Sequence, residues 1–517
     1  MTFFSNVPLA FEHIVREHPH GVALLYPALN ERVTYAELRA EALQIASILR
    51  SRGAARGDVI VIFNDKSPTG FAAMLACLYL GVTYANLDPG SPWKRTEKML
   101  DTCAPRLVVQ LEPEWQYDKA LEARLPGYVL SAADLGAPSC PALEPDVTTI
   151  TGGQPAYIMF TSGSTGTPKG AVISHANLIW FMQWSRDRFA IKPEDVLTNV
   201  NPMYFDNSVF DFYTALFSGA TLVPVLHQQA REPRTLVNIV NAARCTVWFS
   251  VPSMLVYLLT TRALSGSDFG AMRKIIFGGE GFPKAKLKQL WHLFGARADL
   301  ENVYGPTECT CICSAHRIVA ADLEDSQALA PLGRLAQNFD YEILRVDPAD
   351  ETFGELFLRG PHVGLGYYND PARTAAAFTQ NPCNVGYLDM GYHTGDLVRL
   401  DSRGWLHFKG RKDNQVKHMG YRVELEEIEA ALAAVAGVKE CAVVYRKLGE
   451  GLGQIVGFAT IDAAVTAEDL TRGVGKSVPD YMVPRRIVIM DTLPKNANGK
   501  IDRVGLQATL NDAKASL

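Results

Sequence analysis

The chain has 517 residues, which is too long for one ordinary hydrophobic core, so at least two domains are expected. Hydrophobic residues make up 48% of the chain and charged residues 20%, which is the profile of a globular protein in water. The 50 Lys and Arg residues and the 55 Asp and Glu residues form no long run of one sign, and this argues against a nucleic-acid partner.

The sequence shows neither an export signal nor a membrane span. The first nine residues contain no basic flank and no sustained apolar stretch. The longest apolar stretch, residues 71–87, is interrupted by Gly81, Thr83 and Asn86, and it predicts a buried helix followed by a strand. We therefore expect a cytoplasmic protein with no membrane partner.

Strand and helix patterns alternate along most of the chain and predict an α/β protein with parallel strands. Short β-rich runs lie at residues 58–63, 156–160, 245–250 and 274–277, and helical patterns such as residues 284–294 separate them. Beyond residue 340 the strands follow one another closely, at residues 341–346, 355–359, 397–400 and 405–409. A helix at residues 424–435 and strands at residues 440–445 and 454–460 come next. We predict a large N-terminal domain of α/β subdomains plus a β-rich subdomain, residues 1–410, and a small α+β C-terminal domain, residues 411–517.

A stretch rich in serine, threonine and glycine follows the predicted strand at residues 156–160. Residues 160–170 read FTSGSTGTPKG. Glycines let backbone N–H groups converge on an anion, hydroxyl groups add donors, and Lys169 adds positive charge. The spacing does not match the Walker A pattern, and a flexible linker is the alternative. The buried strand before the stretch and the helix start at residues 174–177 favour a phosphate-binding loop.

Five motifs, in this order, resemble those of the adenylate-forming superfamily: the phosphate loop, NVYGPTE at 302–308, YHTGD at 392–396, GRKDNQVK at 410–417 and PKNANGK at 494–500. That superfamily includes acyl-CoA synthetases, luciferases and the adenylation domains of nonribosomal peptide synthetases. Two further stretches, residues 205–213 and 420–429, look most like stand-alone amino-acid-activating members such as the D-alanine:carrier-protein ligases. The resemblance implies ATP-dependent formation of an acyl-adenylate, followed by transfer of the acyl group to a thiol.

The resemblance also implies how ATP and Mg²⁺ are held. Glu308, beside Thr307, would bind Mg²⁺, a hard cation that prefers oxygen ligands. Asp396 would accept hydrogen bonds from the ribose, Arg411 would lie between ribose and phosphate, and Lys500 would bridge the substrate carboxylate and the phosphate. The phosphates would lie on the loop residues Thr161, Ser162, Gly163, Ser164, Thr165, Gly166 and Lys169, and the adenine against Tyr304, Gly305, Asn302, Gly279 and Glu280. Taken singly, Glu308 and Asp396 could be ordinary turn residues and Lys500 a solvated lysine.

The substrate class depends on Asp206, which follows Phe205. In amino-acid-activating relatives the Asp at this place pairs with the α-ammonium group, and a carboxylate in a pocket needs such a charged partner. The alternative role is an N-cap for a helix over the apolar run that follows.

The same resemblance predicts an apolar side-chain pocket lined by Asn207, Phe210, Phe249, Ile276, Gly278, Val303, Cys311 and Ile312. The absence of charge argues against Lys, Arg, Asp and Glu as substrates. The D-alanine ligases typically carry a cysteine where this chain has Gly278, and the glycine leaves more room. We expect a small or branched apolar amino acid first and D-alanine second.

The nine cysteines show no disulfide framework. Cys309, Cys311 and Cys313 alternate as on a strand, but no fourth ligand has the spacing that a structural zinc site needs. We therefore expect packed core cysteines at these positions.

The acceptor thiol is expected on the phosphopantetheine arm of a separate carrier protein, because only 14 residues follow Arg503. In relatives the small domain rotates between the two half-reactions, which implies a hinge at Lys412 and Asp413 and a thiol path past Gly420. Three alternatives remain open: coenzyme A as acceptor, a carboxylic acid without an amino group as substrate, and an inactive scaffold of the same fold.

Overall fold

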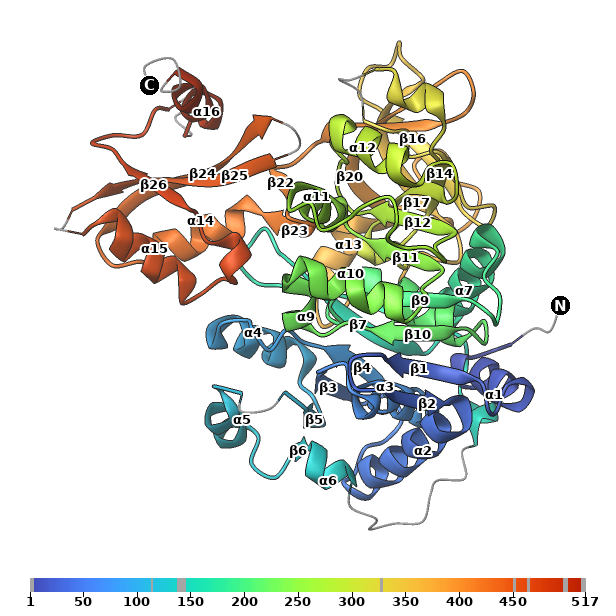
Figure 1. Cartoon of the computed structure of the whole chain (residues 1–517). Coiled ribbons are helices and arrows are strands. Elements are labelled where there is room, and N and C mark those ends of the chain that lie inside the picture. The colour runs from blue at the N-terminus through green and yellow to red at the C-terminus, as the bar shows by residue number, and fades with distance from the viewer. Residues whose placement is uncertain are drawn as a thin grey trace.

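The computed structural model describes residues 4–112, 115–136, 146–325, 329–449, 452–462, 465–495 and 501–512. A large N-terminal part contains two parallel-rich sheets and a third, antiparallel sheet, and a smaller C-terminal part lies beside it (Figure 1). This arrangement confirms the predicted α/β class. No helix in the described ranges is long and apolar enough to cross a membrane.

The first large sheet has the strand order β15-β14-β13-β12-β11-β9-β10-β1-β2, and six consecutive members from β13 to β1 run parallel. The predicted strand and helix at residues 274–277 and 284–294 are β12 and α12, Lys284–Phe294. The strands are β1 Val22–Tyr26, β2 Glu31–Thr34, β9 Val196–Asn199, β10 Thr221–Pro224, β11 Val247–Ser250, β12 Lys274–Gly278, β13 Asp299–Tyr304, β14 Ser314–Arg317 and β15 Arg334–Leu335.

The second large sheet has the order β18-β8-β7-β4-β3-β5-β6. Its strands are β3 Val59–Phe63, β4 Thr83–Asn86, β5 Leu107–Gln110, β6 Val129–Ser131, β7 Pro155–Thr161, β8 Lys169–Ser174 and β18 Gly366–Tyr367. The predicted apolar helix is α3, Pro68–Leu80, which carries no charged residue and is buried along most of its length. The helix α3 is buried on several faces because it packs in a core cluster that also contains strand residues of both large sheets.

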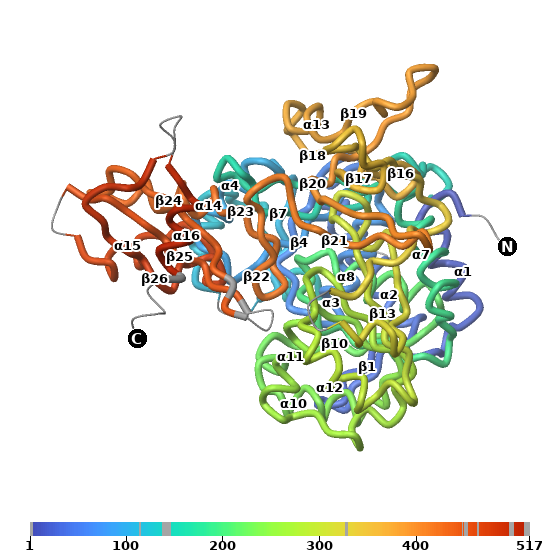
Figure 2. Tube along the Cα trace, turned by 90° about the horizontal axis from the view of Figure 1, so that it is seen from above, coloured from blue at the N-terminus to red at the C-terminus, as the bar shows by residue number. Residues whose placement is uncertain are grey.

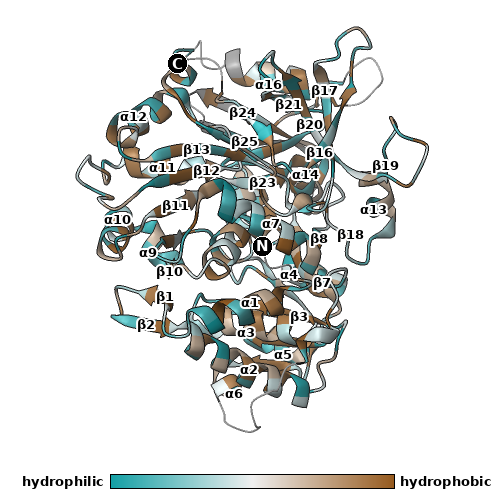
Figure 3. Cartoon of the chain, turned by 90° about the vertical axis from the view of Figure 1, so that its right-hand side faces the viewer, coloured by the Kyte–Doolittle hydropathy of each residue, from teal (hydrophilic) through white to brown (hydrophobic). Residues whose placement is uncertain are grey.

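Helices cover the sheets in layers, and the apolar strands lie inside (Figure 3). The central layer between the two large sheets holds α1 Val7–Glu17, α2 Tyr35–Ser51, α3 and α7 His175–Phe189. The outer face of the first sheet packs against α10 Pro233–Ala242, α11 Pro252–Thr260 and α12. The second sheet packs outward against α4 Trp93–Cys103 and α5 Asp118–Arg124.

The predicted β-rich subdomain is an antiparallel sheet of order β16-β17-β20-β19 with β21 added beside β20. Its strands are β16 Asp340–Arg345, β17 Phe353–Arg359, β19 Phe378–Gln380, β20 Met390–Leu400 and β21 Leu406–Arg411. The last strand ends at Arg411, which is the first residue of the predicted C-terminal domain. The division of the chain at residues 410 and 411 stays a prediction.

The small domain consists of a two-stranded hairpin and a three-stranded sheet with helices on both faces. The elements are β22 Gln415–His418, β23 Tyr421–Glu424, α14 Leu425–Ala433, β24 Val438–Gly449, β25 Leu452–Ile461, α15 Ala467–Gly475, β26 Arg486–Ile489 and α16 Arg503–Asp512. The hairpin packs with α14 and α15, whereas α16 packs on the opposite face. Seen from above, the hairpin lies between the three-stranded sheet of the small domain and the large domain, and α14 also contacts the large domain through Glu427 (Figure 2).

Two local expectations are wrong. Residues 309–313 do not form a strand, because Thr307–Cys309 is a 3-10 turn and both Thr310 and Cys311 have positive φ. The phosphate loop does not run directly into a helix, because β8 lies between the loop and α7. The predicted helix start is correct, and Ser174 forms a capping box with Asn177 at the beginning of α7.

Candidate functional site

The serine- and glycine-rich loop connects the antiparallel strands β7 and β8, and Thr161 pairs with Lys169 at its base. A side chain at Gly163 would overlap the carbonyl oxygen of Thr167, so the tight turn requires glycine there. The tip residues Ser164 and Thr165 are exposed, and Thr165 contacts Arg373. Further along, the carbonyl of Gly166 accepts a hydrogen bond from Lys98 Nζ at 2.6 Å.

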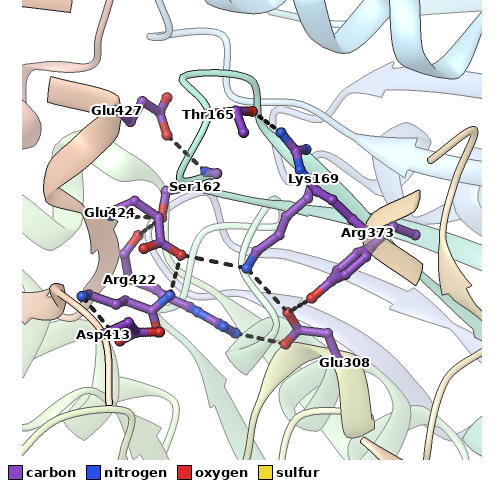
Figure 4. A network of polar contacts seen from close by, with 12 residues as sticks. Ser162, Thr165, Lys169, Glu308, Arg373, Asp413, Arg422, Glu424 and Glu427 are labelled. Atoms are coloured by element: carbon purple, nitrogen blue, oxygen red, sulfur yellow. Dashed lines mark hydrogen bonds and ion pairs between the residues drawn. The ribbon is translucent and has the colours of Figure 1, made fainter. Parts of the chain in front are cut away.

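Glu308 lies at the centre of a charged network opposite this loop (Figure 4). Its carboxylate is fully buried, accepts a hydrogen bond from the Tyr367 hydroxyl at 2.8 Å and pairs with Arg422 Nη1 at 2.7 Å. Lys169 Nζ lies 3.9 Å from the same carboxylate. Burial by itself would raise the pKa of Glu308, but Arg422 and Lys169 outweigh burial and lower this pKa to about 2. Glu308 is therefore ionised at neutral pH.

An ionised carboxylate suits the predicted Mg²⁺ role, because Mg²⁺ takes oxygen ligands. Among the described residues, no group of three or more His, Cys, Asp and Glu side chains could hold a metal ion.

The predicted ribose and adenine residues form a second cluster beside the first. Tyr304, at the end of β13, donates its hydroxyl to Asp396 at 2.6 Å. Arg411 Nη1 lies 2.5 Å from the same Asp396 carboxylate, and Arg411 also pairs with Asp413. The structure thus brings together the aromatic ring, the carboxylate and the cation that the motifs predicted as nucleotide contacts.

The other predicted base contacts have structural partners of their own. Asn302 donates to the carbonyl of Pro331 at 2.8 Å, and Glu280 accepts from the backbone N–H groups of Ser253 and Gly420. A side chain at Gly305 would overlap the backbone of Cys311, so the loop after β13 folds back closely on itself. Gly279, with φ of +94°, follows β12 and adopts a conformation that favours glycine.

Asp206 does not act as a helix cap. It precedes the short helix α8, Asn207–Val209, but its side chain makes no capping hydrogen bond and instead accepts from the Thr307 hydroxyl at 2.5 Å. Burial raises the pKa of Asp206, against the lowering effects of Thr307 and Lys417. Asp206 is therefore linked through Thr307 to Glu308, the next residue along the chain.

Most of the residues predicted to line the side-chain pocket are apolar and buried in the structure. Phe210 and Phe249 meet edge to face with ring centroids 5.0 Å apart. Phe205, next to Asp206, packs edge to face on Tyr421 of the small domain at 4.9 Å. Six predicted pocket residues belong to one buried cluster: Phe210, Phe249, Ile276, Val303, Cys311 and Ile312.

The structure explains why residue 278 is a glycine, which the sequence did not reveal. It pairs with Val303 across β12 and β13, and a side chain there would overlap the carbonyl oxygen of Val303 and come within 2.6 Å of its Cγ2 atom. Glycine at this position therefore serves close strand pairing.

The small domain supplies contacts that sequence reasoning missed. Its hairpin brings Arg422 to the site, where Arg422 Nη1 lies 2.7 Å from the Glu308 carboxylate. The same hairpin carries Lys417: burial raises the pKa of Asp206, and the charge of Lys417 acts to lower it. Lys417 ends the motif at 410–417 and Arg422 lies in the stretch 420–429, so motif position was a usable signal, but the contact with Glu308 depends on tertiary structure.

Lys500 lies outside the described residues. Its described flanks are Lys495, which pairs with Glu440 at 2.7 Å, and Ile501, which bridges back to Lys495. Leu493, before this segment, packs with α16 on the face of the small sheet opposite the hairpin. The hinge residue Lys412 pairs with Glu355 at 2.9 Å.

The cysteines at 309, 311 and 313 are free and buried, which agrees with packed core positions. Burial raises the pKa of each of the three thiols.

The chain belongs to the AMP-binding enzyme family, which matches residues 11–368, while the C-terminal domain of AMP-binding enzymes matches residues 427–500. It is 34% identical over 515 residues to an L-proline–[L-prolyl-carrier protein] ligase of Pseudomonas fluorescens, covering 96% of this chain and 97% of that protein. It is also 32% identical to a plipastatin synthase component of Bacillus subtilis, with 97% of this chain matched to only 19% of that longer protein. The solved structure of holo-PA1221, a nonribosomal peptide synthetase protein with adenylation and PCP domains, superposes with a TM-score of 0.83 at 25% identity and covers 97% of this chain and 84% of that one.

The strand pairing at Gly278 can be tested directly. We expect Gly278→Ala to lower stability by about 1–3 kcal/mol, because an added methyl group would force β12 away from β13. Thermal or urea unfolding measures the change. Gly266→Ala is the matched control, since no atom lies within 4 Å of its added Cβ. Equal stability of the two variants would contradict the close pairing.

Proposed function

We propose that this protein uses ATP and Mg²⁺ to convert an amino acid into its aminoacyl-adenylate and then transfers the aminoacyl group to the phosphopantetheine thiol of a carrier protein. The observation that carries the proposal is the joining of two clusters by Thr307, whose hydroxyl binds Asp206 and whose neighbour is Glu308. An ammonium group on Asp206 would place the substrate carboxylate beside the phosphate groups that Glu308 and the loop would hold.

The side chains at the site would act by positioning and by neutralising charge. Lys169 and the loop N–H groups would hold the leaving phosphates, and Arg411 would hold the α-phosphate and the ribose. Asp396 would bind the ribose hydroxyls in place of its present partner Tyr304. Mg²⁺ would neutralise the phosphate charge that develops as pyrophosphate leaves.

The substrate is proposed to be a small or branched apolar amino acid. The eight residues predicted to line the side-chain pocket include no charged residue, so a charged substrate side chain would find no partner among them. The matched Pseudomonas ligase is named for L-proline, which is also uncharged in its side chain.

Amino-acid-dependent exchange of labelled pyrophosphate into ATP tests this function. We expect exchange with one or a few apolar amino acids in a panel of the standard amino acids, D-alanine and simple fatty acids. Exchange with a fatty acid alone would assign a non-amino substrate, and no exchange with any acid would favour an inactive scaffold.

The role of Asp206 gives a specific prediction. Asp206→Ala should reduce the kcat/KM for the amino acid by about 10²-fold or more, because losing one partner of a desolvated charge pair costs about 3–5 kcal/mol. Binding of ATP alone should change little, which titration calorimetry can measure. A kcat/KM equal to that of the unchanged protein would contradict the ammonium role.

The two half-reactions should respond differently when Lys500 and Gly420 of the small domain are changed one at a time. Lys500→Ala should slow pyrophosphate exchange by roughly 10²–10³-fold, the cost of losing one preorganised charged donor, and should spare transfer from supplied aminoacyl-adenylate. Gly420→Ala should do the reverse, because φ is +82° and an added Cβ would lie 2.7 Å from the Val251 side chain of the large domain.

Both variants are assayed separately for exchange and for carrier loading from preformed adenylate. Gly57→Ala serves as the control for a positive-φ glycine, since φ there is +91° and no atom lies within 4 Å of the added Cβ. Equal impairment of both steps by Lys500→Ala would mean that one fixed arrangement serves both reactions.

A further inference from the structure

Carboxylates of the small domain bind the N–H and ammonium groups of the large domain that are suited to bind pyrophosphate. The backbone N–H of Gly163, at the turn of the phosphate loop, donates to Glu427 Oε2 at 3.1 Å. Backbone N–H groups in such a loop form an anion-binding concavity. In this arrangement the anion in contact with the loop is a carboxylate from α14.

Glu427 is held firmly in this position. Only 3% of its side chain is exposed, and its second oxygen pairs with Arg95 of α4, whose side chain is 7% exposed. Two buried charges that meet across the two domains stabilise their contact only while both partners are present. Glu427 thus joins the phosphate loop to Arg95 on the large domain.

A second carboxylate, that of Glu424 at the end of β23, makes similar contacts with the loop. Glu424 Oε1 lies 3.5 Å from Lys169 Nζ, and the Glu424 backbone N–H donates to Ser162 Oγ at 3.2 Å. The Ser162 hydroxyl in turn donates to the carbonyl of Arg422 at 2.7 Å. Figure 4 shows Lys169 pointing between Glu424 and Glu308. The lysine, the serine and the glycine that would bind phosphate oxygens are therefore all in contact with the small domain.

Pyrophosphate and the small domain cannot use these groups together. A bound pyrophosphate would compete with both carboxylates for the Gly163 N–H and for Lys169. It would also place several negative charges against Glu427 and Glu424 in a buried site, where like charges repel strongly. Departure of pyrophosphate frees these groups.

We propose that Glu427 and Glu424 are positioning residues for the thiol-transfer step, which hold the small domain against the large domain by binding the phosphate loop after pyrophosphate leaves. Docking in this arrangement brings Gly420 against Glu280 and Val251. Release of the first product is thereby coupled to assembly of the second active arrangement. The inference rests on the proposed function for the two half-reactions, but the docking itself can be measured without any substrate.

The kinetic test compares Glu427→Gln and Glu424→Gln with Glu426→Gln. The control is a carboxylate of the same helical turn whose hydrogen-bond partner is Asn414 of the small domain instead of the phosphate loop. Glu427→Gln and Glu424→Gln should each slow carrier loading from supplied adenylate by about tenfold relative to the control, the scale for one charged hydrogen bond. Pyrophosphate exchange should be unchanged or faster, which also shows that the variants are folded. Equal loading rates in all three variants, or equal loss of both half-reactions, would overturn the proposal.

The docking test uses fluorescence energy transfer between the exposed Cys383 of the large domain and a label attached after Lys439→Cys in the small domain. Titration with inorganic pyrophosphate, without ATP or amino acid, should lower the energy transfer in the otherwise unchanged protein. The Glu427→Gln variant should show the lower energy transfer before any pyrophosphate is added, and pyrophosphate should change it less. If pyrophosphate binds, as calorimetry reports, and the energy transfer does not change, the proposal is wrong. A protein that lacks exchange with every acid but still shows this response would refute the proposed function while leaving the docking mechanism intact.

Discussion

The site between the two domains is built around one fully buried carboxylate, that of Glu308. A buried carboxylate remains ionised only when positive and hydrogen-bonding partners surround it. Its partners come from three places in the chain: Lys169 at the base of the phosphate loop, Tyr367 on β18 and Arg422 on the hairpin of the small domain. The site is therefore complete only when the second large sheet, which carries both the phosphate loop and β18, meets the hairpin of the small domain.

Charge compensation also explains why the site holds so many internal contacts. Asp206 binds Thr307, Asp396 binds Tyr304 and Arg411, and the loop N–H of Gly163 binds Glu427. Each of these polar groups is one that a nucleotide, a metal ion or an amino acid would use. Within a site that excludes water, such groups need protein partners when a ligand does not satisfy them. A ligand that replaced these contacts within the protein would also break contacts between the two domains, so ligand binding would be linked to the arrangement of the domains.

The accuracy of the sequence predictions varies along the chain in a physically understandable way. Strands such as β3 and β12 and the helix α12 lie within a residue or two of their predicted bounds, because their apolar pattern reflects burial between layers. The strand β8 was missed since it begins at the lysine that ends the phosphate loop and contains Gly170. The prediction of a strand at residues 309–313 was wrong because the backbone turns there, with positive φ at Thr310 and Cys311. The alternating cysteines are buried by packing in the core and not by pairing in a sheet.

The sequence by itself determined the α/β class, the order of the five motifs and the membership of the AMP-binding enzyme family. These features are local, since residue type and spacing along the chain carry them. Only the tertiary structure decided that Asp206 binds Thr307 instead of capping a helix, that Gly278 is required by its neighbour Val303, and that Glu427 reaches the phosphate loop 264 residues away. The physical reason is that burial and partnership of a charged or small residue depend on which segments the fold brings together, and no local pattern encodes that meeting.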